Sequence, residues 1–364
     1  MGSYIKAIGT ANPGQPIPQK SIASFMVKAH GLEGQEQSKL EALFRSTGIS
    51  SRYSVISDYS GNGQRNFFPK TNNLEPFPST KMRMDLFRNK AVDLSLRAVY
   101  DCLGNKFQLN QITHLITVSC TGMYAPGLDI DLVTQLGLPS TTSRSAINYM
   151  GCYAAINALR IADSICKSDV AAKVLVVCVE LCSIHFQKVN SEDNYLANSI
   201  FGDGAAAVLI SSGMTKEMDL ELLSFYSDIL DYGKEEMAWT IDDFGFQMKL
   251  SSYVPDVIRK GIAELTYRFL SGNNLELKDI DFFAIHPGGK RILDEIESEL
   301  GMEKSKNQYA REVLKNYGNM SSPTVLFVVK SLLSIIKKND KGKIILVMAF
   351  GPGLTIETVL LRVV

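Results

Sequence analysis

The sequence predicts an α/β fold made of two similar halves, in which helices cover buried sheets. Short apolar runs rich in β-branched residues alternate with longer segments whose apolar residues recur every three or four positions. This alternation is typical of sheets with helices packed on their faces. Each half also contains an apolar helix whose first turn carries a reactive polar residue, Cys152 in the first half and Asn319 in the second. We therefore expect the two halves to share one site.

The length of 364 residues corresponds to about two domains. We place the boundary after Gly213. The first predicted unit, residues 1–213, carries the cysteine, and the second, residues 214–364, carries a candidate histidine and asparagine.

The first half is predicted to begin with helical structure over 20–50, a long loop rich in glycine, asparagine and proline over 58–80, and an amphipathic helix over 84–104. It then continues with a buried strand over 112–120, a helix over 152–168, a strand over 172–181 and a strand region that ends near 213. The second half is predicted to contain a helix over 254–270, a strand with its turn over 280–289, a helix over 289–300, a helix entered through a Gly-Asn turn over 317–336, and two strands joined by a Gly-Pro-Gly turn over 343–364.

The composition argues against several classes of protein. Lys plus Arg and Asp plus Glu are equal at 38 each, so no net charge attracts nucleic acid or an anionic membrane. The start of the chain lacks the basic and apolar regions of a signal peptide, and no apolar run approaches the roughly 18 to 20 residues that span a bilayer. The six cysteines form no CxxC pair, which argues against a disulfide framework or a zinc site. We expect a cytoplasmic protein with free thiols, no metal and no integral membrane segment.

Cys152 is a candidate nucleophile because it lies at the start of the helix predicted over 152–168. A thiol in that position lies among unpaired N–H groups at the positive end of the helix dipole, and both features favour the reactive thiolate. The alternative is a small residue packed in the core, and this stretch alone does not decide between the two.

His286 and Asn319 are candidate partners of that thiol. His286 ends an apolar strand, a position that suits an active site in an α/β sheet, although a hydrogen-bonded core histidine is equally possible. Asn319 either caps the following helix or donates its amide to a developing oxyanion. A cysteine beside a histidine makes a thiolate–imidazolium nucleophile, and imidazole with an amide can hold a thioester enolate. The set therefore predicts decarboxylative carbon–carbon bond formation.

Along nearly its whole length the chain resembles the type III polyketide synthases, the chalcone synthase-like enzymes of the thiolase superfamily. The motifs that carry the resemblance occur in family order and spacing: Gly-Cys at 151–152, IFGDGAAAV at 200–208, AIHPGG at 284–289, YGNMSS at 317–322 and FGPGLTIET at 350–358. The resemblance implies the five-layered αβαβα thiolase fold with two similar halves, a homodimer, and acyltransferase activity that needs no cofactor beyond coenzyme A (CoA) thioesters as substrates.

The resemblance also implies roles for individual residues. Cys152 matches the acyl-accepting nucleophile, and His286 and Asn319 match the pair that polarises the thioester carbonyl and supports malonyl decarboxylation. The residues that match the cavity wall or its entrance are Phe201, Phe246, Ser321 and Gly353. The residues near the positions that meet CoA phosphates are Lys39, Arg45 and Arg291.

Several cavity positions depart from the plant chalcone synthases. Ala125 stands where the plant enzymes have a methionine that reaches into the partner's cavity, and Ala349 replaces the first glycine of the closing loop. The other departures are Cys120, Cys182, His185 and Met237. The stretches GCYAA and ELCSIHFQ look more like bacterial members that use fatty acyl starters and make alkylpyrones or alkylresorcinols.

We therefore expect repeated condensation of malonyl-CoA onto a medium or long acyl-CoA starter bound to Cys152, followed by lactonisation or aldol cyclisation. An apolar tunnel lined by Ala125 and Cys182 would favour such a starter, at about 0.8 kcal/mol for each buried methylene. The nearest alternative is a ketoacyl synthase III-type enzyme that performs one condensation onto an acyl carrier protein. A non-catalytic scaffold with the thiolase fold is the alternative from a different class.

Overall fold

Nine strands form one mixed sheet within the part of the chain that the computed structural model describes, residues 2–61, 65–214, 218–230, 233–251 and 253–364. Their order across the sheet is β11-β12-β13-β8-β1-β7-β6-β4-β5. Their bounds are β1 (Ser3–Ala11), β4 (His114–Ser119), β5 (Ser143–Asn148), β6 (Lys173–Leu181), β7 (Asp203–Ser211), β8 (Leu220–Ile229), β11 (Phe282–Ile285), β12 (Ile344–Gly351) and β13 (Thr355–Val363). Two small sheets pair β2 (Ile17–Pro18) with β3 (Ser51–Arg52) and β9 (Met237–Asp242) with β10 (Gly245–Leu250).

The strand order repeats between the two halves of the chain. β4, β6, β7 and β1 in the first half correspond to β11, β12, β13 and β8 in the second. In each set the first pair is parallel and the next two pairs are antiparallel. The sets meet where β1 pairs antiparallel with β8, and β5 extends the first set only. The boundary that we placed after Gly213 lies between β7 and β8 and stays a prediction.

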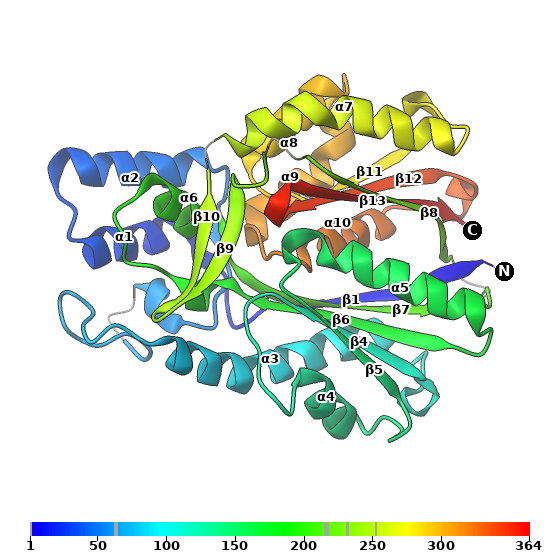
Figure 1. Ribbon diagram of the computed structural model, residues 1–364, viewed down its shortest axis with the longest axis horizontal. Coiled ribbons are helices and arrows are strands. Elements are labelled where there is room, and N and C mark those ends of the chain that lie inside the picture. Colours follow the sequence, from blue (N-terminus) through cyan, green and yellow to red (C-terminus); the bar gives the residue numbers. More distant parts are fainter. Residues whose placement is uncertain (1, 62–64, 215–217, 231–232, 252) are drawn as a thin grey trace.

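Helices lie between the two sets of strands and on their outer faces (Figure 1). α5 (Ala154–Ser168) and α10 (Thr324–Leu333) contact strands of both sets and form the middle layer. α3 (Thr80–Leu103) and α4 (Leu128–Leu136) cover the outer face of the first set, and α7 (Val254–Gly272) and α8 (Lys290–Glu299) cover that of the second. The order of layers is αβαβα, so the predicted thiolase-type architecture is confirmed.

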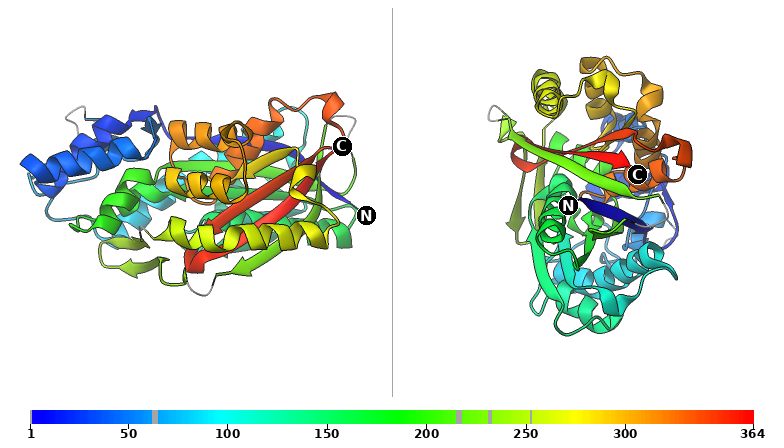
Figure 2. Two further views of the ribbon diagram at one scale, coloured as in Figure 1. Left: turned by 90° about the horizontal axis from the view of Figure 1, so that it is seen from above. Right: turned by 90° about the vertical axis from the view of Figure 1, so that its right-hand side faces the viewer.

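The sequence of α5 explains its central position. Ala155, Ala158 and Ala162 are completely buried, and these small side chains let the helix pack closely against strands on both sides. α9 (Gln308–Tyr317) packs against α8 and α10. At one end of the molecule, α1 (Gln19–His30), α2 (Gly34–Ser46), α6 (Glu192–Ile200) and the β9–β10 hairpin extend beyond the strands (Figure 2).

The starts of the two central helices differ from the prediction. α5 begins at Ala154, and Cys152 lies in a single 3₁₀ turn, Gly151–Tyr153, directly before it. α10 begins at Thr324 and its N-cap is Pro323, so Asn319 lies in the preceding loop. The prediction that Asn319 belongs to the first turn of a helix is wrong, and so is the alternative that it caps that helix. Ser321 has a φ of 58°, a left-handed conformation that the helix cannot include.

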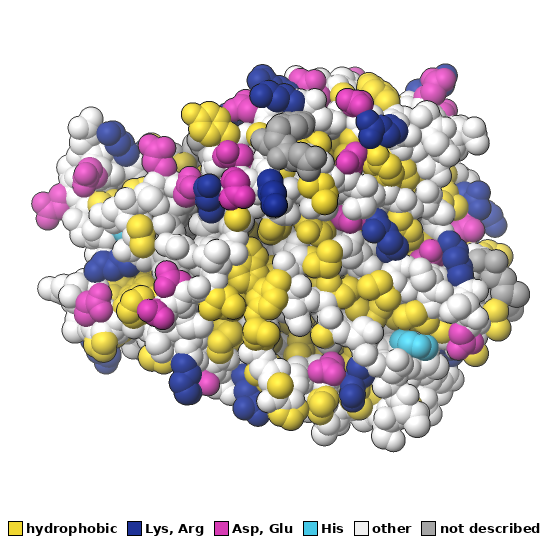
Figure 3. Space-filling model, viewed as in Figure 1, with side chains coloured by type: hydrophobic (Ala, Val, Ile, Leu, Met, Phe, Trp, Pro, Cys, Tyr) yellow, Lys and Arg dark blue, Asp and Glu magenta, His cyan; other side chains and the backbone are white. Residues whose placement is uncertain are grey.

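Apolar side chains gather near the middle of the face that carries β9 and α5 (Figure 3). Exposed apolar residues on these two elements include Ile161 on α5, at 39% exposure, and Ile241 on β9, at 61%. Within the described ranges, no helix combines the length and apolar character that crossing a bilayer requires. All six cysteines are free thiols, as predicted.

Candidate active site

Three of the predicted residues, Cys152, His286 and Asn319, come together around one cavity, which we call the cysteine cavity. Cys152 lies in the 3₁₀ turn before α5, His286 directly follows β11, and Asn319 lies in the loop before α10. The cavity thus draws on both halves of the chain, as predicted. Its other lining residues are Cys120, Gly151, Phe201, Met237, Ala238, Trp239, Met248, Leu250, Gly288, Ile292, Ser321, Phe350 and Pro352.

Two glycines allow the Gly-Pro-Gly loop to lie directly on the turn that carries Cys152. A Cβ atom on Gly151, whose φ is +77°, would lie 2.2 Å from Cδ of Pro352. A Cβ atom on Gly351 would lie 2.6 Å from Cδ1 of Tyr153. Both distances are far below van der Waals contact, so only glycine fits at these positions. The loop therefore closes the cavity beside the thiol.

Burial dominates the electrostatics of the Cys152 thiol. The residue is 8% exposed, and desolvation raises its pKa to about 11, against the opposing effect of hydrogen bonds from Ser321 and Asn319. The nearby Glu180 carboxylate raises this pKa further. Burial therefore opposes the thiolate that the start of a helix is predicted to favour. A base must remove the proton.

The amide of Asn319 is held in one orientation beside this thiol. The backbone N–H of Ser321 donates to Oδ1 over 2.8 Å, which leaves Nδ2 as the donor. Sγ of Cys152 lies 3.9 Å from Nδ2, which also donates to the carbonyl oxygen of Gly288 over 3.4 Å. The backbone of Asn319 is fixed as well, because its N–H donates to the carbonyl oxygen of Ile200 over 3.0 Å. The amide can therefore donate a hydrogen bond at a defined place in the cavity.

His286 is buried without a hydrogen-bond partner. Its side chain is 1% exposed, and no described residue supplies a partner to either ring nitrogen. Burial lowers the pKa of the imidazole to about 3, so the ring is neutral near pH 7. Its backbone N–H donates to the carbonyl oxygen of Met348 over 2.8 Å, which ties the end of β11 to β12. The ring nitrogens are therefore free to bind a proton or an oxygen atom that enters the cavity.

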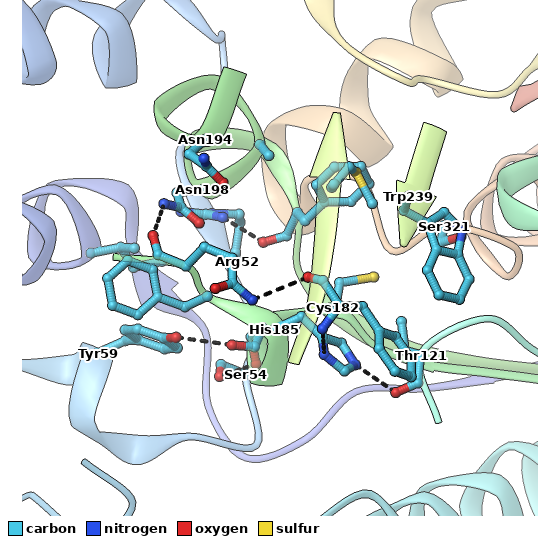
Figure 4. Close-up of a pocket in the computed structure, with 18 of the residues that line it drawn as sticks. Arg52, Ser54, Tyr59, Thr121, Cys182, His185, Asn194, Asn198, Trp239 and Ser321 are labelled. Carbon is cyan, nitrogen blue, oxygen red and sulfur yellow. Dashed lines mark hydrogen bonds between the residues drawn. The ribbon is translucent and has the colours of Figure 1, made fainter. Parts of the chain in front are cut away.

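A second cavity, which we call the inner cavity, shares Cys120, Phe201, Trp239, Met248 and Ser321 with the cysteine cavity. The predicted residues Cys182, His185 and Phe246 line the inner cavity instead (Figure 4).

His185 is a fixed part of the inner-cavity wall. Its Nε2 donates to the carbonyl oxygen of Thr121 over 2.7 Å, and Nδ1 accepts from the backbone N–H of Phe246 over 3.0 Å. Its ring stacks on the ring of Phe246, with a centroid distance of 4.1 Å and an interplanar angle of 9°. Burial lowers the pKa of His185 to about 3, so this ring is also neutral.

An outer groove reaches the cysteine cavity from α2, α6 and the start of α8. It shares Leu250, Gly288 and Ile292 with that cavity. The predicted residues Lys39 and Arg291 line this groove. Arg45 does not line it, because its side chain is 70% exposed and lies 3.8 Å from Glu41 one turn earlier on α2.

The remaining predicted residues lie at the edges of the site. Met237 lines the cysteine cavity and also a surface hollow, where Gly353 lies. Ala125 is exposed, precedes a cis peptide bond to Pro126, and lines neither cavity of its own chain. The expectation that Ala125 lines an acyl tunnel stays a prediction, because the resemblance places this position at the cavity of a partner subunit.

The sequence analysis missed several residues of the site. Met248 and Leu250 line the cysteine cavity and follow Phe246 at alternate positions of β10, so the two-residue period of a strand could have identified them. Glu180 is completely buried and accepts hydrogen bonds from the backbone of Cys120 (3.0 Å) and the hydroxyl of Thr121 (2.8 Å). Its signal in the sequence was a single carboxylate at the end of the apolar run AKVLVVCVEL.

In the described part of the chain, no three His, Cys, Asp or Glu side chains come close enough together to hold a metal ion. The prediction that catalysis needs no cofactor beyond the CoA thioesters themselves stays a prediction.

Comparisons with known proteins agree with this geometry. The family models for the N-terminal and C-terminal domains of chalcone and stilbene synthases match residues 2–214 and 221–364. The alpha-pyrone synthesis polyketide synthase-like Pks18 of Mycobacterium tuberculosis is 29% identical, over 100% of this chain and 91% of that protein. Type III polyketide synthase A of Arabidopsis thaliana is 30% identical, over 98% of this chain and 91% of that protein.

A solved structure is equally similar. The crystal structure of PKS-I from the brown alga Ectocarpus siliculosus has a TM-score of 0.91 and 29% sequence identity, and the match covers 100% of this chain and 98% of that one. The family models cover almost the whole chain, and the structural likeness extends to the complete five-layered fold. The chain therefore belongs to the chalcone and stilbene synthase family of type III polyketide synthases, which are acyltransferase-type enzymes that use malonyl-CoA and acyl-CoA.

Proposed function

We propose that this chain repeatedly condenses malonyl-CoA onto an acyl-CoA starter held as a thioester on Cys152, with His286 and Asn319 stabilising the enolate. The observation that carries the proposal is the convergence of these three side chains on one cavity, where the buried imidazole has no hydrogen-bond partner among the described residues. Unpaired buried polar groups are costly, and a catalytic role is one of the reasons for which they are retained.

The first step is the transfer of the starter to the thiol. When each group is considered by itself, burial places the pKa of Cys152 at about 11 and that of His286 at about 3, so both groups are neutral near pH 7. Transfer of the thiol proton to the imidazole creates two opposite charges together, and each is then the counter-ion of the other. The thiolate attacks the thioester carbonyl of the starter, and the CoA thiolate leaves with the proton that His286 holds.

The second step is decarboxylation of malonyl-CoA in the same cavity. The bond to the carboxylate breaks, carbon dioxide leaves, and its electron pair forms an enolate whose charge lies on the thioester oxygen. Nδ2 of Asn319 and a ring N–H of His286 donate to that oxygen. The enolate carbon attacks the acyl thioester on Cys152, which releases the thiolate for the next cycle.

The outer groove is suited to deliver the CoA thioesters. It opens along α2 and α6, shares three residues with the cysteine cavity, and is lined by Lys39 and Arg291. We propose that these two side chains meet the phosphates of CoA while the thioester end extends toward Cys152. The exposed position of Arg45 does not support the same role.

We further propose that the starter is a medium or long acyl group and that the product is cyclised to an alkylpyrone or alkylresorcinol type. The apolar part of the inner cavity, with Cys182 and Phe246 in its wall, supports an acyl starter. The similarity to Pks18, whose name refers to alpha-pyrone synthesis, supports the lactone product.

A homodimer is also proposed. The apolar area on the face of β9 and α5, and the exposure of Ala125 beside its cis proline, are consistent with a second copy covering this face and placing Ala125 at the partner's cavity.

The proposed reaction is tested by incubating the purified chain with malonyl-CoA and a panel of acyl-CoAs, without any carrier protein. Mass spectrometry should show products that contain two or more malonyl-derived units, and free CoA should be released in proportion. A ketoacyl synthase III-type enzyme would give a single condensation and would need malonyl groups on a carrier protein, so that result would reject the proposal. The absence of any turnover would favour the non-catalytic scaffold.

A further inference from the structure

Arg52, on β3, is a buried guanidinium whose hydrogen-bonding capacity is only partly used. The side chain is 3% exposed, Nε donates to Oε1 of Gln19 over 2.9 Å, and Nη1 donates to the carbonyl oxygen of Phe201. Nη2 is buried, and no acceptor among the described residues lies within hydrogen-bonding distance. Although burial lowers the pKa of Arg52 to about 10, the group stays charged near pH 7. The two N–H groups of Nη2 are therefore unpaired within the described part of the chain.

Arg52 lines the inner cavity, beyond the wall that this cavity shares with the cysteine cavity. Figure 4 places Arg52, Asn194 and Asn198 on one side of the inner cavity and Trp239 and Ser321 on the other. Trp239 and Ser321 also line the cysteine cavity, whereas Arg52 and the two asparagines do not. An acyl chain that extends from Cys152 past this shared wall therefore approaches Arg52.

The surroundings of Arg52 combine apolar walls with polar groups at this end. Ile22, Met26 and Phe186 provide apolar surface, while Asn194 and Asn198 of α6 add side-chain amides. Among the described residues, the side chain of Asn198 makes only a long hydrogen bond, 3.3 Å from its Nδ2 to the carbonyl oxygen of Gln187. A purely hydrocarbon tail would leave the Nη2 donors of Arg52 unpaired, whereas an oxygen atom on the tail would accept from them.

The charge near Arg52 argues for a neutral oxygen rather than a carboxylate. The carboxylate of Asp203 already acts electrostatically on Arg52 and is held by the backbone N–H groups of Ser183 and Val55, each over 2.8 Å. A second buried carboxylate would be repelled by Asp203. In addition, Nη1 is engaged with the carbonyl oxygen of Phe201, so the two-nitrogen fork that binds carboxylates is not free.

We propose that the inner cavity is a starter-tail subsite that selects acyl-CoA starters with a neutral oxygen, a hydroxyl or ketone, at or near the far end of an apolar chain. Nη2 of Arg52 donates to that oxygen, and Asn194 and Asn198 complete the polar end. This inference rests on the proposed function, because the acyl chain reaches the cavity from Cys152. It refines the expected fatty acyl starter to an oxygenated one.

The test compares starters of equal length on the wild-type enzyme. Octanoyl-, decanoyl- and dodecanoyl-CoA are each compared with their terminal hydroxy and terminal carboxy counterparts, at fixed malonyl-CoA. At the best length, the hydroxy starter should exceed the plain one in kcat/KM by about tenfold or more, because it pairs a buried charged donor. Equal or lower values for the hydroxy starters would overturn the proposal, and so would a preference for the carboxy starters. Failure of all starters to release CoA would instead reject the proposed function.

Two variants locate the effect, and an exposed residue supplies the control. Arg52→Gln should bring the hydroxy-to-plain ratio close to one, but it also breaks contacts to Gln19 and Phe201, so its folding must be checked by circular dichroism. Asn198→Leu makes the same end apolar and should lower the ratio without that risk. Asn316→Leu, at an exposed position of α9, should leave the ratio unchanged. An unchanged ratio in folded Arg52→Gln and Asn198→Leu would reject this location.

Binding can be followed independently of turnover. Trp239 is the only tryptophan in the sequence and lines both cavities. Terminal hydroxy acyl-CoAs should therefore change the intrinsic fluorescence at lower concentration than plain acyl-CoAs, and Asn198→Leu should remove that difference. Identical titrations of the two starters in the wild type would contradict the subsite.

Discussion

His286 and His185 are two buried neutral histidines with opposite hydrogen-bonding states. Burial lowers the pKa of both to about 3. His185 uses both ring nitrogens, toward Thr121 and Phe246, and stacks on the ring of Phe246. Neither ring nitrogen of His286 has a partner among the described residues. His185 is thus a fixed part of the inner-cavity wall, whereas His286 can still donate or accept a hydrogen bond in the cysteine cavity.

The difference shows that burial and a shifted pKa do not by themselves identify a catalytic histidine. Both residues meet those criteria, yet only His286 can exchange a proton or a hydrogen bond without first breaking an existing one. His286 lines one cavity together with Cys152 and Asn319. The state of the hydrogen bonds is therefore the more informative observation.

The largest expected effect comes from His286→Gln. Glutamine keeps a polar side chain but removes the imidazole N–H that donates to the enolate oxygen, so malonyl decarboxylation should fall by about 10²- to 10³-fold. Because no hydrogen bond is lost, the free energy of unfolding should change by less than about 1 kcal/mol. Release of radiolabelled carbon dioxide and urea unfolding measure the two quantities. A stable variant with full decarboxylation would remove His286 from the mechanism.

His185→Gln should show the reverse pattern. The substitution removes the ring that stacks on Phe246 and at least one of two buried hydrogen bonds, so the free energy of unfolding should fall by about 2 to 4 kcal/mol. Decarboxylation by the folded variant should fall much less than in His286→Gln. His114→Gln is the matched control, because His114 lies at the start of β4 and its ring, within the described ranges, bonds only to the neighbouring Thr113. Equal urea midpoints for the wild type and His185→Gln would contradict the fixed-wall assignment.

A pH dependence that both histidines share is the smallest expected effect when it is compared over a single pH unit. The folded-state pKa of about 3 lies below the ordinary 6.5, so the unfolded chain binds the proton first as the pH falls. The stability that each neutral histidine contributes is therefore complete above pH 6.5 and is lost as the pH falls toward 3. Below pH 6.5 the wild type should lose about 1.4 kcal/mol for each pH unit relative to His286→Gln. Parallel stability curves for the two proteins would show that His286 is not held neutral.

Much of this architecture was predictable because periodicity and motif order depend on local sequence. The buried strands around 114–119, 173–181 and 344–351 and the helix over 154–168 followed from apolar runs and helical spacing. The pairing of β1 with β8, which joins the two halves, could not be predicted in this way, because strand partners far apart in sequence leave no periodic signal. The strand β1 itself and the helices α4, α6 and α9 were also missed.

The site was predicted in its residue types and less well in its physical state. The convergence of Cys152, His286 and Asn319 followed from the motifs, but the thiolate at Cys152 did not follow from its place near a helix start, because burial opposes it. Among the described residues, the His286 ring has no hydrogen-bond partner and the Arg52 guanidinium uses only part of its donors. Both states depend on which atoms of distant segments fall within about 3.5 Å, and sequence patterns do not contain that information.

The central claim is that Cys152 carries the acyl chain, and intact-mass measurement tests it most directly. Incubation with an acyl-CoA starter alone, without malonyl-CoA, should add one acyl group to each wild-type chain, and peptide mapping should place it on Cys152. Cys152→Ala should remain unmodified under the same conditions while His185→Gln, if folded, is still acylated. Full acylation of Cys152→Ala, or an acyl group on another cysteine of the wild type, would contradict the account.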